Sequence, residues 1–230
     1  MKTIRKVALT AAAGALVLTS LGTPAALAQS AASNGAGQPA LADLDNPLMG
    51  TDSNCPLSYG NTYPAVAVPL RMNSWTPVTG EPGSGWGYTY DGEKISGIKQ
   101  THQPSPWMND YAAFALMAET GPVKVKQQER GSWFSHKAEV ARPYSYKVYL
   151  ADYDVTAEVT PTTRAAQFRF TFPQSDDAHI LLDGLAGGSM VRVDAQNRRV
   201  TGYVRNNRGG VPDNFHSYFL AEFDRDFTLA

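Results

Sequence analysis

Hydrophobic and polar residues alternate with a period of two through much of the second half of the chain. Within residues 144–150, aromatic or aliphatic side chains occupy every second position from Tyr144 to Leu150. The same alternation recurs over residues 155–160 and over residues 166–172, where three phenylalanines alternate with polar residues. Successive side chains of a strand point to opposite faces of the sheet, so each of these segments predicts a strand with one buried face.

Shorter apolar runs bounded by glycine, proline, asparagine or aspartate predict further strands. These runs are residues 65–68, 88–90, 95–100, 111–118, 179–185, 190–193, 199–204 and 218–223, with one more starting at Phe227. Asp91-Gly92 is a hairpin-turn signal, and residues 195–198 predict the turn of a second hairpin. With about ten strands and no convincing amphipathic helix, the pattern predicts an all-β fold, a large antiparallel β-sandwich.

Composition agrees with this fold class and excludes several kinds of function. The 230 residues are 43% hydrophobic, enough for a sizeable core, and 20 glycines with 15 prolines suit strands joined by tight turns. The formal net charge of -1 gives no basic surface of the kind that binds nucleic acid. Cys55 is the only cysteine, which excludes an intrachain disulfide and a cysteine-based metal site.

The N-terminal residues have the three parts of a secretory signal peptide. Basic residues in the first six positions precede an apolar segment, 7–21, that is short for a membrane span, and Ala26-Leu27-Ala28 fits a cleavage site. We therefore expect a signal peptide over residues 1–28, a flexible leader over 29–42 and the β-sandwich over 43–230. The protein would be secreted, periplasmic or on the cell surface, with no later membrane span; a retained N-terminal anchor is the alternative.

The candidate binding chemistry is concentrated in the loop after residue 100. Pro104 and Pro106 restrict this loop and exclude a helix. A rigid loop that presents aromatic and polar groups together suits a polyhydroxylated ligand such as a sugar, which offers apolar faces for stacking and hydroxyls for hydrogen bonds. The predicted ligand-binding residues of this loop are His102, Gln103, Trp107, Asn109 and Asp110.

Two glycine-rich turns extend the predicted site. Residues 80–87 (GEPGSGWG) lack the lysine and the following helix of a phosphate-binding loop, so we expect Trp86 to be a stacking platform for a sugar ring. Residues 209–215 (GGVPDNF) could form a second rim through Asp213 and Asn214. For any one tryptophan, core packing is the alternative.

Catalytic groups are scarce. Neighbouring serine and histidine residues do not make a catalytic triad, whose members come from separate elements. Acidic residues at a turn between strands are usually solvated, and no histidine has a zinc-binding partner at helical spacing. We therefore expect structural roles for the following residues: Ser132, Ser135, His136, Asp152, Asp154 and Glu158.

Five segments, in order along the chain, resemble the N-terminal domain of glycoside hydrolase family 92. They are residues 60–64 (GNTYP), 99–107 (KQTHQPSPW), 131–141 (GSWFSHKAEVA), 146–152 (YKVYLAD) and 209–215 (GGVPDNF). The resemblance runs from about Asp45 to the end of the chain. It implies a secreted bacterial exo-α-mannosidase of two domains, in which the sandwich packs on a C-terminal (α/α)6 barrel and sugar binds at their junction.

The resemblance also implies a calcium ion needed for catalysis and hydrolysis with inversion. The catalytic acid and base would lie in the barrel, which this chain does not contain, so we expect no catalytic residue here and most calcium ligands elsewhere. The best matches to the family's pocket are Trp86 and His102. Arg71 stands where the family has glycine, which would change the local backbone and the pocket edge.

These observations give two hypotheses of different classes. In the first, the chain is the carbohydrate-binding sandwich of a calcium-dependent inverting exo-α-mannosidase that acts on glycans, truncated before its own catalytic domain and inactive alone. In the second, it is a stand-alone secreted carbohydrate-binding or adhesion module. A complete enzyme of 230 residues lacks support, because no acid–base pair stands out.

Overall fold

The computed structural model describes residues 40–80, 87–103, 108 and 110–229. The predicted signal peptide and almost all of the predicted leader lie outside these residues. No helix within the described part is long and apolar enough to span a membrane. The described helices are short: the 3-10 helices η1 (Leu41–Leu44) and η2 (Cys55–Asn61), and the α-helix α1 (Gln127–Arg130).

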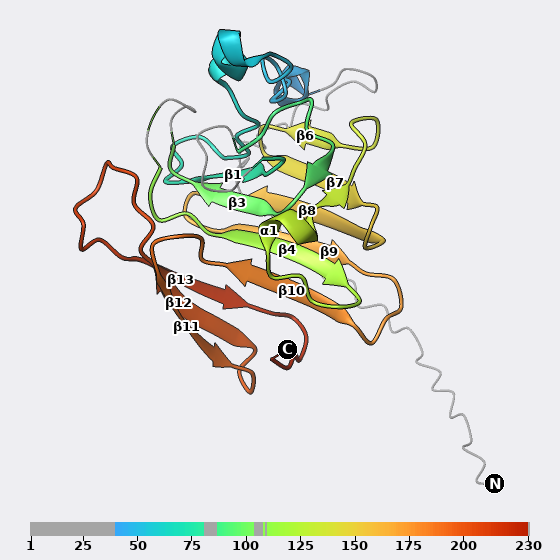
Figure 1. Ribbon diagram of the computed structural model, residues 1–230, viewed down its shortest axis with the longest axis vertical. Helices are drawn as coiled ribbons and strands as arrows, with labels where there is room; N and C mark the ends of the chain where they lie inside the picture. Colours follow the sequence, from blue (N-terminus) through green and yellow to red (C-terminus); the bar gives the residue numbers. More distant parts are fainter. Residues whose placement is uncertain (1–39, 81–86, 104–107, 109, 230) are drawn as a thin grey trace, which may run out of the picture. The chain divides into compact units, whose positions relative to one another are not determined.

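The strands form antiparallel sheets, as the alternation predicts (Figure 1). The β4 sheet has the order β1 (Ser74–Pro77), β3 (Ile98–Thr101), β4 (Ala115–Thr120), β10 (Ala178–Asp183). The β8 sheet contains β6 (Val140–Arg142), β7 (Ser145–Leu150), β8 (Val155–Pro161) and β9 (Ala166–Thr171). The β12 sheet contains β11 (Ser189–Asp194), β12 (Arg199–Val204) and β13 (Ser217–Glu222). A small pair joins β2 (Lys94–Ile95) to β5 (Ser132–Trp133).

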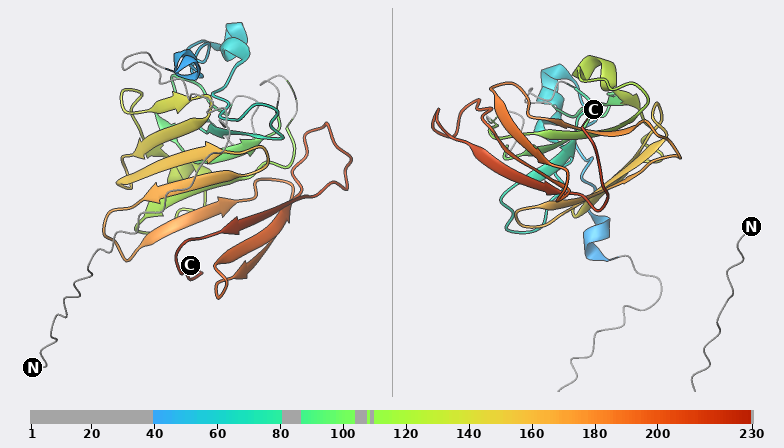
Figure 2. Two further views of the ribbon diagram at one scale, coloured as in Figure 1. Left: turned by 180° about the vertical axis from the view of Figure 1, so that it is seen from behind. Right: turned by 90° about the horizontal axis from the view of Figure 1, so that it is seen from below.

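The hydrophobic core lies between the β4 and β8 sheets, which are stacked one behind the other (Figures 1 and 2). Trp75 of β1 packs edge-on against Phe168 of β9, with ring centroids 4.9 Å apart, and so joins the two sheets. On β7 and β8 every second residue is buried, from Tyr146 to Val159, which confirms the predicted alternation there. Burying one such side chain completely contributes about 1.5–3 kcal/mol.

The β4 sheet differs because β1 and β3 are buried at every residue. Trp75 faces the core, so its neighbours in the alternation, Ser74 and Thr76, point to the opposite face, where Thr101 and Lys99 lie beside them in register. That opposite face is therefore polar and yet buried. The candidate site is built on it, because Lys99 and Thr101 point from this face toward Asp110.

Several strand predictions are wrong in detail. Only Val66 of residues 65–68 pairs, through an isolated bridge to Trp75, because the neighbouring Ala67 donates its N–H to the Pro143 carbonyl instead. Residues 88–90 are not a strand, since the Thr89 N–H donates to the Thr79 hydroxyl at 2.8 Å. The hairpin turn predicted at Asp91-Gly92 is wrong as well: the turn lies one residue earlier, closed by the Gly92 N–H on the Thr89 carbonyl at 3.1 Å, and the following strand β2 pairs with β5 instead.

The strand predicted over 111–118 begins only at Ala115. The Asn206 side chain takes the place of a neighbouring strand at Ala113, accepting from its N–H at 2.7 Å and donating to its carbonyl. Residues 227–229 are also not a strand, and the Phe227 ring turns back onto Phe223 with centroids 4.8 Å apart. Tyr144, expected on the inner face, is 41% exposed.

Candidate functional site

The site is built on a buried ion pair at the end of β3. The Lys99 Nζ atom lies 3.1 Å from Oδ2 of Asp110, and the side chains are only 3% and 12% exposed. The Thr101 hydroxyl donates to the same oxygen at 2.8 Å. Lys99 and Thr101 lie on the covered polar face of the β4 sheet, because strand residues two apart share a face. The strand therefore presents two donors to one carboxylate.

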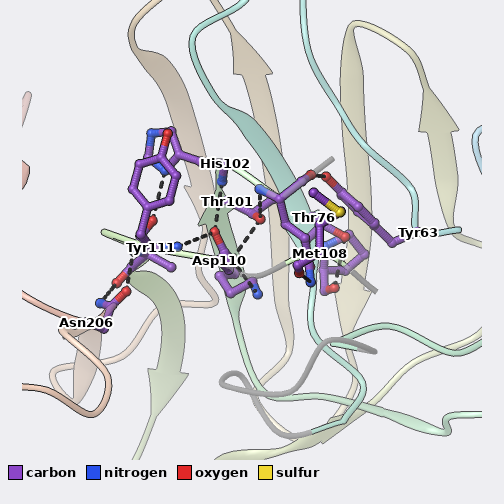
Figure 3. A network of polar contacts seen from close by, with 12 residues as sticks. Tyr63, Thr76, Thr101, His102, Met108, Asp110, Tyr111 and Asn206 are labelled. Atoms are coloured by element: carbon purple, nitrogen blue, oxygen red, sulfur yellow. Dashed lines mark hydrogen bonds and ion pairs between the residues drawn. The ribbon is translucent and has the colours of Figure 1, made fainter. Parts of the chain in front are cut away.

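The second Asp110 oxygen holds the loop itself. Oδ1 accepts the backbone N–H of His102 at 3.0 Å and that of Tyr111 at 2.9 Å (Figure 3). Asp110 therefore accepts four hydrogen bonds from within the protein and closes the loop from residue 101 to residue 111. Asp110, predicted as a ligand-binding residue, has both oxygens occupied by protein donors.

His102 is held in one orientation. Its Nδ1 atom lies 3.0 Å from the Tyr111 carbonyl oxygen, and its ring stacks on the Tyr111 ring with centroids 4.7 Å apart (Figure 3). A carbonyl only accepts, so Nδ1 carries the proton, and in the neutral ring Nε2 is then an acceptor. No described residue is recorded as bonded to Nε2.

Gln103 is 6% exposed and serves as a structural link. Its backbone N–H donates to the Thr101 hydroxyl at 3.0 Å, and its side-chain amide donates to the Met108 carbonyl at 2.7 Å. Its carbonyl accepts the Tyr63 hydroxyl. Burial, with a smaller contribution from the charge of Asp110, raises the pKa of Tyr63 to about 12, so Tyr63 remains a donor at neutral pH.

A polar pocket of about 300 Å³ opens beside His102. Its lining residues are Leu70, Arg71, Met72, Asn73, Ser74, Thr101, His102 and Gln103. We call it the Arg71–His102 pocket. The Arg71 Nε atom donates to the Ser74 hydroxyl at 2.8 Å, which holds its guanidinium at the edge. Asn73 is 6% exposed, and within the described part its side-chain oxygen has no hydrogen-bond partner. The residue that departs from the family pattern, Arg71, thus lines the pocket.

The second predicted rim lies directly beside this loop. The Arg208 N–H donates to the Asp110 carbonyl at 3.0 Å, and Asn207 pairs with Tyr111 in an isolated bridge. The Phe215 ring packs edge-on against the Tyr111 ring, with centroids 5.9 Å apart. The structure thus brings residues 207–215 next to residues 110–111. Asp213 and Asn214 are exposed.

Three predicted ligand-binding residues, Trp86, Trp107 and Asn109, lie outside the described residues, and their roles stay predictions. Sequence reasoning missed Lys99, Thr101 and Tyr111, which position His102, and Asn73 in the pocket. No alternation signalled Lys99, because its neighbour Gln100, on the other face of the strand, is polar too.

The serine, histidine and acidic residues expected to be structural do have structural partners. His136 contacts Glu139 and the Tyr90 carbonyl rather than a serine. The Ser132 hydroxyl accepts the Asp152 N–H at 3.0 Å, and Asp154 accepts the Tyr149 hydroxyl at 2.8 Å. Glu158 lies between Lys147 and Arg169, 3.9 and 3.8 Å away.

The described residues contain no cluster of acidic side chains that would form the centre of a calcium site. Calcium takes about 6–8 oxygen ligands, several of them carboxylates. Across residues 40–80, 87–103, 108 and 110–229, no three His, Cys, Asp or Glu side chains lie together in a way that could hold a metal ion. Asp110, the acid nearest the pocket, is already bonded to Lys99.

Comparison with known proteins identifies the fold family. The glycosyl hydrolase family 92 N-terminal domain matches residues 46–230. A family 92 inverting mannosidase from Bacteroides thetaiotaomicron is similar over 81% of this chain, with 46% identity and a TM-score of 0.75. A family 92 α-mannosidase from the same organism is similar over 84% of the chain, with 29% identity and a TM-score of 0.66.

The same α-mannosidase in complex with mannoimidazole gives 28% identity over 81% of the chain and a TM-score of 0.64. This chain spans about a quarter of the length of those proteins, 25%, 27% and 26% respectively. No protein with a curated description matches it. The 185 matched residues and the likeness to two family 92 mannosidases lead to one conclusion: the chain belongs to the glycosyl hydrolase family 92 N-terminal domain family.

Proposed function

We propose that this chain is the N-terminal sandwich of a secreted, calcium-dependent, inverting exo-α-mannosidase and forms one wall of its substrate pocket. The observation that carries the proposal is the 46% identity, over 81% of the chain, to a protein described as an inverting mannosidase. The whole protein would act on α-mannosides of glycans. Secretion rests on the N-terminal sequence, and calcium on the family resemblance.

The Arg71–His102 pocket supports a role in sugar binding. A sugar hydroxyl both donates and accepts hydrogen bonds, so it pairs best with a surface that offers both. His102 Nε2 offers an acceptor, the Arg71 guanidinium offers donors, and the buried Asn73 oxygen offers a second acceptor. The Asp110 network holds His102 before any ligand arrives, which lowers the entropic cost of binding.

The rim of the pocket supports contact with the rest of the enzyme. Leu70 is 94% exposed and Met72 is 60% exposed, and both line the pocket. Exposed apolar side chains around a polar floor are typical of an interface. We infer that the protein's own (α/α)6 domain covers this rim, so that the substrate binds between the two domains.

The catalytic carboxylates belong to that second domain in this proposal. Inversion needs two carboxyl groups about 6.5–9.5 Å apart, with a water between one of them and the sugar. In the described part, the buried carboxylates beside His102 and His136 are already bonded to protein donors. Asp110, beside His102, is paired with Lys99, and Glu139, beside His136, accepts the Tyr146 hydroxyl. This chain alone would therefore bind or shape the substrate and would not hydrolyse it.

The test is an assay of the full-length gene product and of this chain on α-linked manno-oligosaccharides. We expect hydrolysis with inverted anomeric configuration, followed by NMR, for the full-length protein only. Activity should disappear on chelation of calcium and return when calcium is added. A full-length protein without α-mannosidase activity, or activity of this chain alone, would overturn the proposal.

A stand-alone carbohydrate-binding module is the second candidate. The observation in its favour is that this chain itself holds His102, through Asp110 and Tyr111 (Figure 3), with Lys99 paired to Asp110. Titration of the chain with mannose and α-mannobiose, followed by tryptophan fluorescence, separates the two. Saturable binding by a chain with no catalytic domain in its gene would favour the module.

A further inference from the structure

Both ring nitrogens of His136 face hydrogen-bond acceptors. Nδ1 lies 2.6 Å from Oε2 of Glu139, and Nε2 lies 2.7 Å from the carbonyl oxygen of Tyr90. A neutral imidazole has a single N–H, whereas the imidazolium has two. Because a backbone carbonyl cannot donate, Nε2 must carry a proton. The contact to Glu139 then needs a second proton, located on Nδ1 or on the carboxyl group.

Glu139 has the environment of an anion. Its side chain has no exposed surface, and its Oε1 atom accepts the Tyr146 hydroxyl at 2.5 Å and the Tyr88 hydroxyl at 3.4 Å. Burial, together with the charge of Glu139, raises the pKa of both tyrosines, so both remain donors. Hydrogen bonds donated to a carboxylate favour its charged form, which places the shared proton on His136.

No other cation is recorded on Glu139 in the described part. Arg142, which lines the shallow pocket beside Glu139, faces Asp43 instead, with 3.7 Å between the charged atoms. A buried charge without a counter-ion is costly, so Glu139 requires the positive form of His136. Besides Glu139, the residues recorded on the His136 ring are Tyr90, stacked at 3.8 Å, and Phe134, edge-on at 4.8 Å.

We propose that His136 is an imidazolium in the folded protein and that its ion pair with Glu139 is a pH-sensitive link between residues 88–93 and the loop 134–139. The two segments meet only through a few further contacts in the described part, among them the Phe134 N–H on the Glu93 carbonyl at 3.4 Å. Tyr88 and Tyr90, from the first segment, both contact the pair. Loss of one proton therefore weakens the contact between these two segments.

The direction of the pH effect follows from the charge. The proposed ion pair exists only while His136 carries both ring protons, so its contribution to stability is present at acidic pH and disappears at alkaline pH, where the ring is neutral. Tyr88 and Tyr146 do not titrate in this range, since burial raises the pKa of each above its ordinary value. Once His136 has lost its second ring proton, one of its two ring nitrogens presents a lone pair to an oxygen that also only accepts, so that contact is no longer a hydrogen bond.

Nitrogen-15 NMR of histidine-labelled protein tests the protonation state directly. We expect both ring nitrogens of His136 to be protonated at pH 6 in the folded protein, since each of them faces an acceptor. In Glu139→Gln, His136 should lose its proton at a lower pH than in the unmodified protein. A neutral His136 ring at pH 6 in the folded, unmodified protein would overturn the proposal.

A second experiment does not depend on folding of the Glu139 variant. The unfolding free energy of His136→Gln is compared with that of the unmodified protein from pH 5 to pH 9. We expect the unmodified protein to be more stable at pH 5 and to lose most of that advantage by pH 9. The control is His179→Gln in β10, a partly exposed histidine opposite Glu119 whose ring makes no recorded hydrogen bond or ion pair among the described residues, and which should give no such trend. A difference for His136→Gln that does not change with pH would contradict the ion pair.

Discussion

Two buried carboxylates organise this domain in opposite ways. Asp110 receives two backbone N–H groups, a lysine and a threonine, and the histidine beside it keeps one ring nitrogen unbonded in the described part. Glu139 receives two tyrosine hydroxyls and a histidine whose ring nitrogens are both bonded. The first arrangement presents a histidine to a pocket. The second uses a histidine to join two segments.

The difference follows from where the positive charge comes from. At Asp110 it is supplied by Lys99, 3.1 Å away, so His102 is not needed as a counter-ion. At Glu139 the described part offers only His136 for that task. A carboxylate paired with lysine therefore leaves its neighbouring histidine available for a ligand. The role of each carboxylate can be tested by removing one of the side chains that bond to it.

The largest effect is expected for Lys99→Met. Removing one partner of a buried ion pair leaves the other charge uncompensated, which costs about 3–5 kcal/mol of stability. The matched control is Lys147→Met, whose partner Glu158 is 3.9 Å away and whose side chain is 53% exposed. Exposed pairs contribute about 0–1 kcal/mol. Chemical denaturation measures both, and equal losses for the two variants would show that the Lys99–Asp110 pair is not effectively buried.

The next effect concerns Glu139. Tyr146→Phe removes a hydroxyl that donates to a buried carboxylate at 2.5 Å, and a hydrogen bond to a charged group is worth about 1.5–3 kcal/mol. Tyr149→Phe, on the opposite face of the same strand, removes an exposed hydroxyl that donates to Asp154 at 2.8 Å. We expect this second loss to be under about 1 kcal/mol. The ratio of the two losses, from urea midpoints, measures the burial of Glu139.

A third effect appears only at alkaline pH. Burial first, and the charge of Asp110 second, raise the pKa of Tyr63 to about 12, whereas an unfolded tyrosine titrates near 10. The folded state therefore binds the proton more tightly. The resulting stabilisation is complete below about pH 10 and is lost as the pH rises through about 12. Unfolding free energies from pH 9 to 12 should fall less steeply for Tyr63→Phe than for the unmodified protein, and identical slopes would contradict the assignment.

The sequence predicts the β8 sheet far better than the site. On β7, Tyr146 and Val148 face the core while Lys147 and Tyr149 face solvent, so the alternation is visible in the residue types. Both faces of β3 are buried, and one is polar, so Ile98 to Thr101 show no such contrast. The pattern that defines a strand disappears where both of its faces are covered, here one by the core and the other by polar contacts.

The contacts that build the site are also remote in sequence. The start of β4 is decided by Asn206, 93 residues away from Ala113. Nothing near Ala113 signals that its backbone is already bonded. By contrast, the loop composition and the family resemblance predicted His102 as a ligand-binding residue, and the structure places it in the lining of the Arg71–His102 pocket. What could not be inferred is that Asp110 holds the loop, since a carboxylate that binds a sugar and one that binds Lys99 have the same sequence signature.

A small effect on stability and a large effect on function should coincide at His102. Its ring makes one recorded hydrogen bond, to the Tyr111 carbonyl, so His102→Ala should cost about 1 kcal/mol. In the full-length protein the same change should weaken sugar binding at least tenfold if Nε2 contacts the ligand. Such a loss would correspond to about 1.4 kcal/mol of binding free energy.

His102→Asn separates contact from positioning. The asparagine amide can donate to the Tyr111 carbonyl in place of Nδ1, but it has no atom at the position of Nε2. If His102 acts only by holding the loop, the asparagine variant should bind sugar as the unmodified protein does. If Nε2 is the acceptor for a sugar hydroxyl, the asparagine and alanine variants should lose affinity equally while the asparagine variant keeps its stability. Isothermal titration calorimetry measures the affinity of each variant for the sugar, and a denaturation curve measures its stability. Together they decide whether His102, which Asp110 does not need as a counter-ion because Lys99 is present, contacts the ligand.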